Sequence, residues 1–201
     1  YNTDAAGLTR ALLGAGIHVG GERCILIGAG GAAKAAAYVL AKEGAASIYI
    51  MNRNLDRAQE LAEYINRLVG RNLASALPLD GYESIPQEKG GYLAIQSTSV
   101  GMHPHVEDVI VEDRYFYELI HTGVDIVYTP ARTRFMELVE GAGGKAVNGL
   151  DMLLYQGIIA YELWNPQVRV DEETISMARQ LIQDHLSMSQ AKHNLILIGF
   201  M

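Results

Sequence analysis

A short apolar run that ends in closely spaced glycines is the feature that most constrains the fold. Residues 24–27 are apolar and include two β-branched side chains, as expected for a short buried strand. Gly28, Gly30 and Ala33 follow with the spacing G-x-G-x-x-G/A, and an alanine-rich helix is expected directly after them. This spacing is the fingerprint of dinucleotide-binding folds. An ordinary strand-to-helix turn is the alternative that the glycines alone leave open.

The second expected strand, residues 47–51, ends in polar and basic residues. Asn52, Arg53 and Asn54 stand at its tip, and Arg57 follows one helical turn later. A site that prefers NAD places an acidic residue there for the ribose hydroxyls, and this tip holds none. A guanidinium can bind a phosphate with two parallel hydrogen bonds, and the asparagines can add more. Because cations at a helix start oppose its dipole, the pattern favours a ligand, the 2′-phosphate of NADP, over a solvated helix start.

Length, charge and cysteine content limit the class of protein to which this chain can belong. The 201 residues allow one large domain or one and a half. A formal net charge of −7 argues against general affinity for nucleic acid or an anionic membrane. The single cysteine, Cys24, excludes an internal disulfide and fits a reduced, cytoplasmic setting. No apolar run is long enough to cross a membrane. The first residues do not resemble a signal peptide, and the sequence does not begin with an initiator methionine, so a fragment is expected.

The order of the remaining elements predicts a Rossmann-type doubly wound α/β fold. It would have a mainly parallel six-stranded sheet with helices on both faces. Strands are expected at residues 24–27, 47–51, 74–79, 92–96, 123–128 and 145–147, and helices at 5–13, 32–43, 55–69, 132–141, 150–164 and 171–186. The small-residue loop 97–102 should border the ligand crevice. His103 and His105 lie just beyond it without further ligands nearby, so no metal site is expected.

Five motifs occur in the order found in shikimate dehydrogenases, which the chain resembles from Tyr1 to about Leu186. They are Asn2-Thr3-Asp4, Gly28 to Ala32, Asn52-Arg53 with Arg57, Asp125-x-x-Tyr128-x-Pro130, and Asn148-Gly149-x-x-Met152-Leu153-x-x-Gln156. The resemblance implies a connecting segment (1–20) from a missing substrate-binding domain, an NADP-binding domain (21–165) and a C-terminal helix (166–188). It implies NADP-dependent, reversible reduction of 3-dehydroshikimate to shikimate, in the chorismate pathway to aromatic amino acids.

Two alternatives to that activity stay open. Quinate/shikimate dehydrogenases also accept NAD, and Arg57 counts against that branch. A non-catalytic NADP-sensing module would need only the cofactor residues, and the substrate-side residues count against it.

The resemblance also implies roles for individual residues. Asp4 matches a catalytic aspartate that, with a lysine from the other domain, flanks the reacting oxygen, on which hydride transfer builds negative charge. Capping of the first helix by Asp4 or Thr3 remains the structural alternative. Asp4, Tyr128 and Gln156 match substrate-binding positions. Cofactor-binding positions are matched by Gly28, Ala29, Gly30, Gly31, Ala32, Asn52, Arg53, Asn54, Arg57, Ile126, Gly149 and Met152. Met152 could equally be a core residue.

Three departures from the family pattern bear on function. Gln96 replaces the usual asparagine at the end of the fourth strand, and Asn54 stands where threonine is common. The catalytic lysine would precede Tyr1 and has no counterpart here. The chain alone is therefore expected to bind NADP(H) but to turn substrate over poorly.

The tail predicts a further element. Residues 187–193 are polar and linker-like, and 194–201 would form a buried strand ending in glycine. That strand resembles the opening strand of shikimate kinase, whose phosphate-binding loop would begin at Gly199. We therefore expect residues 189–201 to be the linker and first strand of a fused, truncated kinase domain. An extra edge strand fits the same residues equally well.

Overall fold

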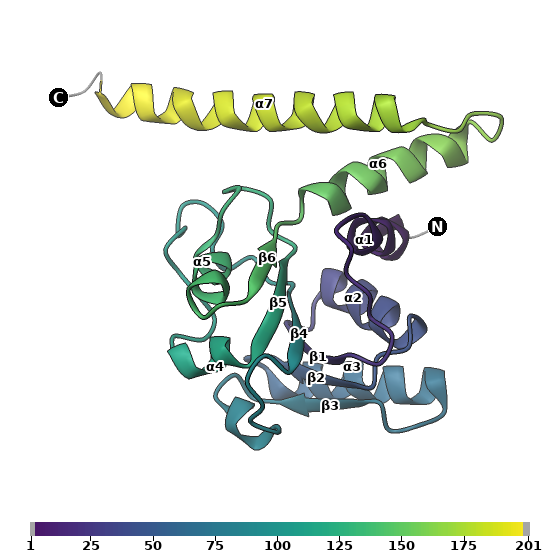
Figure 1. The fold of residues 1–201 in the computed structure, drawn as a ribbon, viewed down its shortest axis with the longest axis vertical. Helices are drawn as coiled ribbons and strands as arrows, with labels where there is room; N and C mark the ends of the chain where they lie inside the picture. Colours follow the sequence, from purple (N-terminus) through teal and green to yellow (C-terminus); the bar gives the residue numbers. More distant parts are fainter. Residues whose placement is uncertain (1–2, 199–201) are drawn as a thin grey trace.

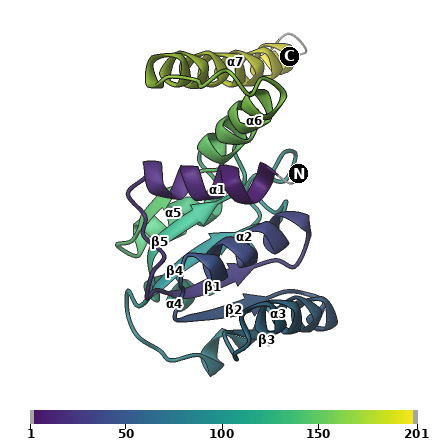
Figure 2. The ribbon, with the colours of Figure 1, turned by 90° about the vertical axis from the view of Figure 1, so that its right-hand side faces the viewer.

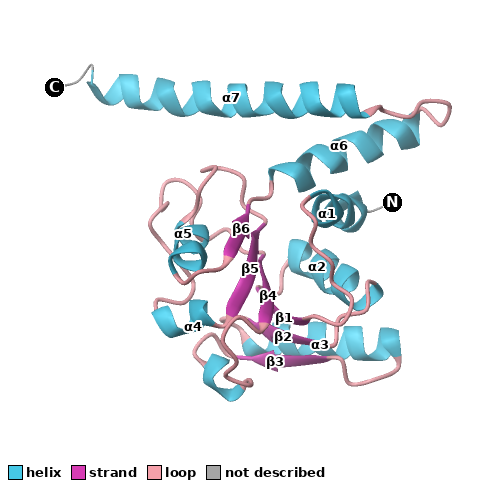
Figure 3. Ribbon diagram, viewed as in Figure 1, coloured by secondary structure: helices cyan, strands magenta, loops and turns pink. Residues whose placement is uncertain are grey.

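A computed structural model describes residues 3–198 of the chain, and the side chains of residues 3–186. Its centre is a six-stranded sheet in which every pair of neighbours is parallel, in the order β3-β2-β1-β4-β5-β6 (Figures 1 and 3). The strands are β1 (Arg23–Ile27), β2 (Ser47–Met51), β3 (Ala74–Leu77), β4 (Tyr92–Gln96), β5 (Ile120–Asp125) and β6 (Lys145–Val147). This topology confirms the predicted doubly wound α/β fold.

Helices cover both faces of the sheet (Figure 2). One core joins the sheet to α1 (Thr3–Gly14), α2 (Gly31–Lys42), α3 (Leu55–Val69) and α6 (Leu150–Trp164). The core on the other face includes residues of the 3₁₀ turn η1 (Gly81–Ser84), α4 (Arg114–Glu118) and α5 (Arg134–Gly141). The buried face of α2 is largely alanine, with Ala33, Ala36 and Ala37 inaccessible, so this helix can lie close to β1.

The strand order determines where a ligand can bind. From β1 the chain winds outward through β2 to β3, and then returns to place β4 on the other side of β1. In an open parallel sheet, the crevice at such a reversal lies outside the carboxyl ends of the strands. The segments that follow β1, β2, β4 and β5 are therefore the ones that can form a site.

Two strands, β5 and β3, differ from their predicted bounds by more than one residue. β5 begins at Ile120 and ends at Asp125, so Tyr128 lies in the loop beyond it rather than in the strand. The Asp125 carboxylate accepts a hydrogen bond from the Val127 backbone N–H at 2.9 Å, which turns the chain out of the ladder. β3 ends at Leu77 because Pro78 cannot donate to the sheet.

The C-terminal segment also differs from the prediction. Helix α7 runs continuously over Glu172–Ile198, where a helix to residue 186, a linker and a strand were expected. It lies beyond α6, away from the sheet (Figures 1 and 2). No glycine or proline interrupts this stretch, and a short apolar run such as 195–198 fits a helix as well as a strand. Gly199, where a phosphate-binding loop was predicted to begin, lies outside the described residues.

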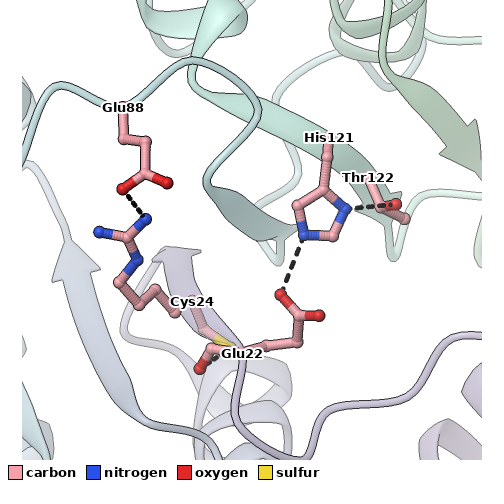
Figure 4. Close-up of polar contacts among 6 residues, drawn as sticks. Glu22, Cys24, Glu88, His121 and Thr122 are labelled. Atoms are coloured by element: carbon pink, nitrogen blue, oxygen red, sulfur yellow. Dashed lines mark hydrogen bonds and ion pairs between the residues drawn. The ribbon is translucent and has the colours of Figure 1, made fainter.

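Polar and charged side chains contact one another at the amino edge of the sheet (Figure 4). Just before β1, Glu22 contacts His121 of β5 through Oε2 and Nε2 at 3.0 Å, and His121 Nδ1 lies 2.9 Å from Thr122 Oγ1. Arg23 pairs with Glu88 in the segment that leads into β4. These contacts link three strands at their starts.

Candidate dinucleotide-binding site

The turn after β1 requires glycine at its first position. Gly28 has a φ of +114°, a conformation that side chains disfavour. A Cβ at Gly28 would also lie 2.7 Å from the Ser97 hydroxyl oxygen, which donates a hydrogen bond to the Ile27 carbonyl at 2.7 Å. The loop after β4 is thereby held directly against the turn after β1. Gly28 thus allows both the turn and the contact between these two segments.

The next two glycines face open space instead. A Cβ built on Gly30 or Gly31 meets no atom within 4 Å. Gly30 is the N-cap of α2 and has no side chain to bond the free N–H groups of the first turn. These N–H groups and the helix dipole form an arrangement that suits a pyrophosphate. Ala29 and Ala32 lie on either side of the two glycines, at the same helix start.

The predicted cofactor residues at the tip of β2 are of two kinds. The asparagines hold the local backbone: Asn52 donates to the Asn54 carbonyl at 2.8 Å, and Asn54 caps α3 by accepting from the Arg57 N–H at 3.1 Å. Arg53 and Arg57 are exposed. Among the residues whose side chains the structure describes, neither guanidinium makes a hydrogen bond or ion pair with protein. Two unpaired cations therefore stand at a helix start, where they oppose the dipole.

A cavity of about 430 Å³ connects the glycine turn to this helix. Sequence reasoning missed four side chains that line it, Lys34 of α2 and Glu60, Leu61 and Tyr64 of α3. The signal for the three on α3 was the helical spacing 57, 60, 61, 64, which places one face of this helix toward the turn. The cavity is lined by Ala29, Gly30, Gly31, Lys34, Arg57, Glu60, Leu61 and Tyr64.

Two of the predicted substrate-binding residues lie in contact. Gln156 Nε2 of α6 donates to Asp4 Oδ1 of α1 at 3.0 Å, although 152 positions separate them in the chain. Both side chains are half-buried. Asp4 lies in the first turn of α1, which begins at Thr3, rather than at a preceding cap position. A Cβ at Gly7 would lie 2.6 Å from Gln156 Cγ, so this glycine lets the two helices approach closely.

The predicted nicotinamide-side residues also converge. Ile126, Gly149 and Met152 line a second cavity, of about 310 Å³, between α1, α6, α7 and the carboxyl ends of β5 and β6. A Cβ at Gly149 would lie 1.9 Å from the Ile126 carbonyl oxygen, so only glycine fits there. Met152 belongs to the main core as well, with 5% of its surface exposed. Tyr128 is half-buried in the loop after β5, and its side chain makes no hydrogen bond to another side chain among the described residues.

The described part of the chain contains neither a cluster of metal-ligating side chains nor a membrane-spanning helix. No three His, Cys, Asp or Glu side chains there gather closely enough to hold a metal ion. His103 and His105 are exposed in the loop after β4. None of the described helices has both the length and the apolar character that crossing a bilayer requires.

Comparison with known proteins finds similarity to shikimate and quinate dehydrogenases. The family model described as shikimate/quinate 5-dehydrogenase matches residues 11–84. A shikimate dehydrogenase (NADP⁺) of Methanopyrus kandleri is 39% identical over 189 residues, which cover 92% of this chain and 63% of the relative.

Two solved structures share the fold. A shikimate 5-dehydrogenase of Listeria monocytogenes in complex with shikimate and NAD is 31% identical, with a TM-score of 0.77 over 88% of this chain and 62% of that one. A chorismate mutase/shikimate 5-dehydrogenase fusion protein from Clostridium acetobutylicum is 26% identical, with a TM-score of 0.78 over 93% and 62%. The chain thus spans about three fifths of the length of these relatives. Over that span the chain is similar in sequence and fold to shikimate dehydrogenases.

Proposed function

We propose that this chain is the NADP-binding part of a dehydrogenase that interconverts 3-dehydroshikimate and shikimate. The observation that carries the proposal is the pair of unpaired guanidiniums, Arg53 and Arg57, beside a glycine turn open to a pyrophosphate. NADP would enter with its pyrophosphate at Gly30 and Gly31 and its 2′-phosphate at the arginines. When bound, NADP⁺ supplies the acceptor for a hydride from the hydroxyl-bearing carbon.

The residues present fit this cofactor in two respects. The backbone at the start of α2 offers N–H donors that no side chain caps, and a side chain at Gly30 or Gly31 would project into the open space there. At the tip of β2, no carboxylate stands where NAD-preferring sites hold the ribose hydroxyls. Glu60 is the acidic side chain that lines the cavity with Arg57, and it weakens the local positive charge without removing it.

On the substrate side, Asp4 and Gln156 form one unit. Their 3.0 Å hydrogen bond leaves the Asp4 carboxylate oriented by α6, and both side chains remain partly accessible. A carboxylate so placed would accept hydrogen bonds from substrate hydroxyls, and the amide of Gln156 would add a donor and an acceptor. Asp4 would also orient the ammonium of the lysine that the family carries in its substrate-binding domain. That ammonium would stabilise negative charge on the reacting oxygen.

The test is turnover by the full-length protein that carries this chain. We expect NADP⁺-dependent oxidation of shikimate and slower oxidation of quinate. Asp4→Asn should lower kcat by about 100-fold or more, as loss of a residue that assists proton transfer does. Gln156→Ala should raise the KM for shikimate about tenfold, the effect of losing a hydrogen bond to a charged group. The Kd for NADPH should change less than about twofold in both variants, because the arginines are untouched.

Asp184→Asn is the matched control, since Asp184 is an exposed aspartate on α7 whose contact is Gln180 on the same helix. It should leave kcat and KM as they are. Absence of shikimate oxidation by the unmodified full-length protein would contradict the proposal. Tight NADPH binding without turnover of shikimate or quinate would favour the NADP-sensing alternative. Equal rates with NAD⁺ and NADP⁺ would favour the quinate/shikimate branch.

A further inference from the structure

A fully buried carboxylate stands at the carboxyl end of β5. Asp125 has no exposed surface, and its Oδ1 accepts from the Val127 N–H at 2.9 Å. Its Oδ2 accepts from the Thr133 hydroxyl at 2.6 Å. Gln96 Nε2, at the end of β4, donates to Oδ1 at 3.2 Å. Every partner is a donor, so the arrangement suits the ionised carboxylate.

Gln96 carries this network into the loop after β4. Its Oε1 accepts from the Thr98 N–H at 2.5 Å, and its Nε2 lies 3.2 Å from the Val100 carbonyl. The Thr98 hydroxyl accepts from the Val100 N–H at 3.2 Å. Loop 97–101 is thereby tied at several points to one side chain, which is itself 2% exposed. The same loop packs against Gly28, so its shape bears on the glycine turn.

The other arm of the network fixes the segment after β5. Thr133 is the N-cap of α5 and bonds both Asp125 and the Met136 N–H. Between Asp125 and Thr133 runs the loop that carries Ile126 and Tyr128. The Val127 carbonyl accepts from the Gly149 N–H at 3.1 Å, so the turn at Asp125 also places the residue that starts α6. Both loops on this side of the crevice therefore depend on one carboxylate.

Ordinary packing does not explain a charge at this place. Within the described residues no cation pairs with Asp125, and burial raises the pKa of its carboxyl to about 6. A buried charge without a counter-ion is costly, and apolar side chains often replace such groups without loss of stability. Buried polar groups that disfavour folding concentrate at functional sites. The position of Asp125, between two loops of the crevice, is such a site.

We propose that Asp125 is a positioning residue that, through Gln96 and Thr133, holds loops 97–101 and 126–130 as the nicotinamide-side wall of the crevice. The effect on kcat expected from this inference rests on the proposed function, whereas the effect expected on the two loops does not. Asp125 need not touch substrate or cofactor, because its effect passes through Ile126, Tyr128 and the loop after β4. Gln96 takes part through a side chain one methylene longer than the usual asparagine.

The test is hydrogen–deuterium exchange of the backbone amides, combined with kinetics, in the full-length protein. Asp125→Asn and Thr133→Val should each raise exchange in segments 97–101 and 126–130 by about tenfold relative to β1, which lies outside the network. Thr133→Ser, which keeps the hydroxyl, should restore the slow exchange. With NADP⁺ and shikimate both saturating, Thr133→Val should lower kcat about tenfold. The Kd for NADPH should change less than about threefold, because Arg53 and Arg57 stand elsewhere.

Tyr117→Phe is the matched control for a lost buried hydrogen bond. Tyr117 is 1% exposed and donates to the Val111 carbonyl at 2.6 Å; it shares a core with Phe135 of α5 but bonds neither Asp125 nor Thr133. It should leave exchange in both loops unchanged relative to β1. Unchanged loop exchange in Thr133→Val, or an equal rise in Tyr117→Phe, would overturn the inference. If the unmodified protein does not oxidise shikimate, the proposed function fails while the exchange result still decides the positioning role.

Discussion

Charged side chains are paired at one edge of the parallel sheet and unpaired or buried at the other. At the amino edge, Glu22 pairs with His121 and Arg23 with Glu88, all at side chains between about three and six tenths exposed (Figure 4). At the carboxyl edge, Arg53 and Arg57 have no partner among the described side chains, and Asp125 is buried without a cation. Exposed pairs contribute little to stability, whereas unpaired and buried charges oppose folding. The difference indicates that the carboxyl edge is arranged for a ligand.

The largest expected loss of stability comes from overpacking at the carboxyl edge of the sheet. Gly149→Ala would set a methyl group 1.9 Å from the Ile126 carbonyl oxygen, so the segments after β5 and β6 must separate. We expect unfolding free energy to fall by at least about 3 kcal/mol in denaturant titration. Gly141→Ala is the control, since a Cβ there meets no atom within 4 Å and alanine favours the helix. Equal stability of the two variants would contradict this close contact.

A second, slightly smaller effect concerns pH. Burial raises the pKa of Asp125 from 3.8 to about 6, so between these values the folded state binds more protons than the unfolded state. The contribution of this group to stability is therefore present below pH 4 and is lost as pH rises through 6. It amounts to about 3 kcal/mol, from about 1.4 kcal/mol for each pKa unit.

Asp125→Asn removes that titration. The unfolding free energy of the variant minus that of the unmodified protein should rise by about 2 kcal/mol between pH 4 and pH 7. Chemical denaturation at several pH values measures it. A difference that stays constant with pH would show that Asp125 titrates normally in the folded protein, contrary to its burial.

The smallest effect is expected at the amino edge. Glu22→Gln keeps a hydrogen-bond acceptor for His121 and removes only the charge, at side chains about one third exposed. The unfolding free energy should change by less than about 1 kcal/mol, and less still in high salt. The Kd for NADPH should not change. A loss of unfolding free energy as large as that in Gly149→Ala would contradict the proposed difference between the two edges.

Sequence reasoning succeeded where the signal is local. The strand, glycines and alanine-rich helix after Cys24 lie within a dozen residues, and the basic tip of β2 follows the next strand directly. Both were found from spacing and chemistry. By contrast, the hydrogen bond between Asp4 and Gln156 joins residues 152 positions apart, and only family resemblance brought them together. Pairwise contacts over such separations leave no periodic signal.

Other features were missed for equally physical reasons. The short helix α4 spans only Arg114–Glu118, too few residues for a helical period to emerge. The end of β5 depends on where the Asp125 side chain turns back on the backbone, which composition does not reveal. Lys34 and Tyr64 join the cavity because two helices meet at the glycine turn. These details arise from tertiary packing rather than local preference.

The most direct test of the central claim compares cofactor affinities in the full-length protein. Kd values for NADPH and NADH would be measured by fluorescence titration, with Arg53→Ala, Arg57→Ala and the exposed control Arg67→Ala. Arg67 lies on the last turn of α3 and pairs with Glu63. We predict that NADPH binds at least about tenfold more tightly than NADH, and that either arginine variant, but not the control, largely abolishes this ratio. Equal affinities for the two cofactors in the unmodified protein would contradict the account.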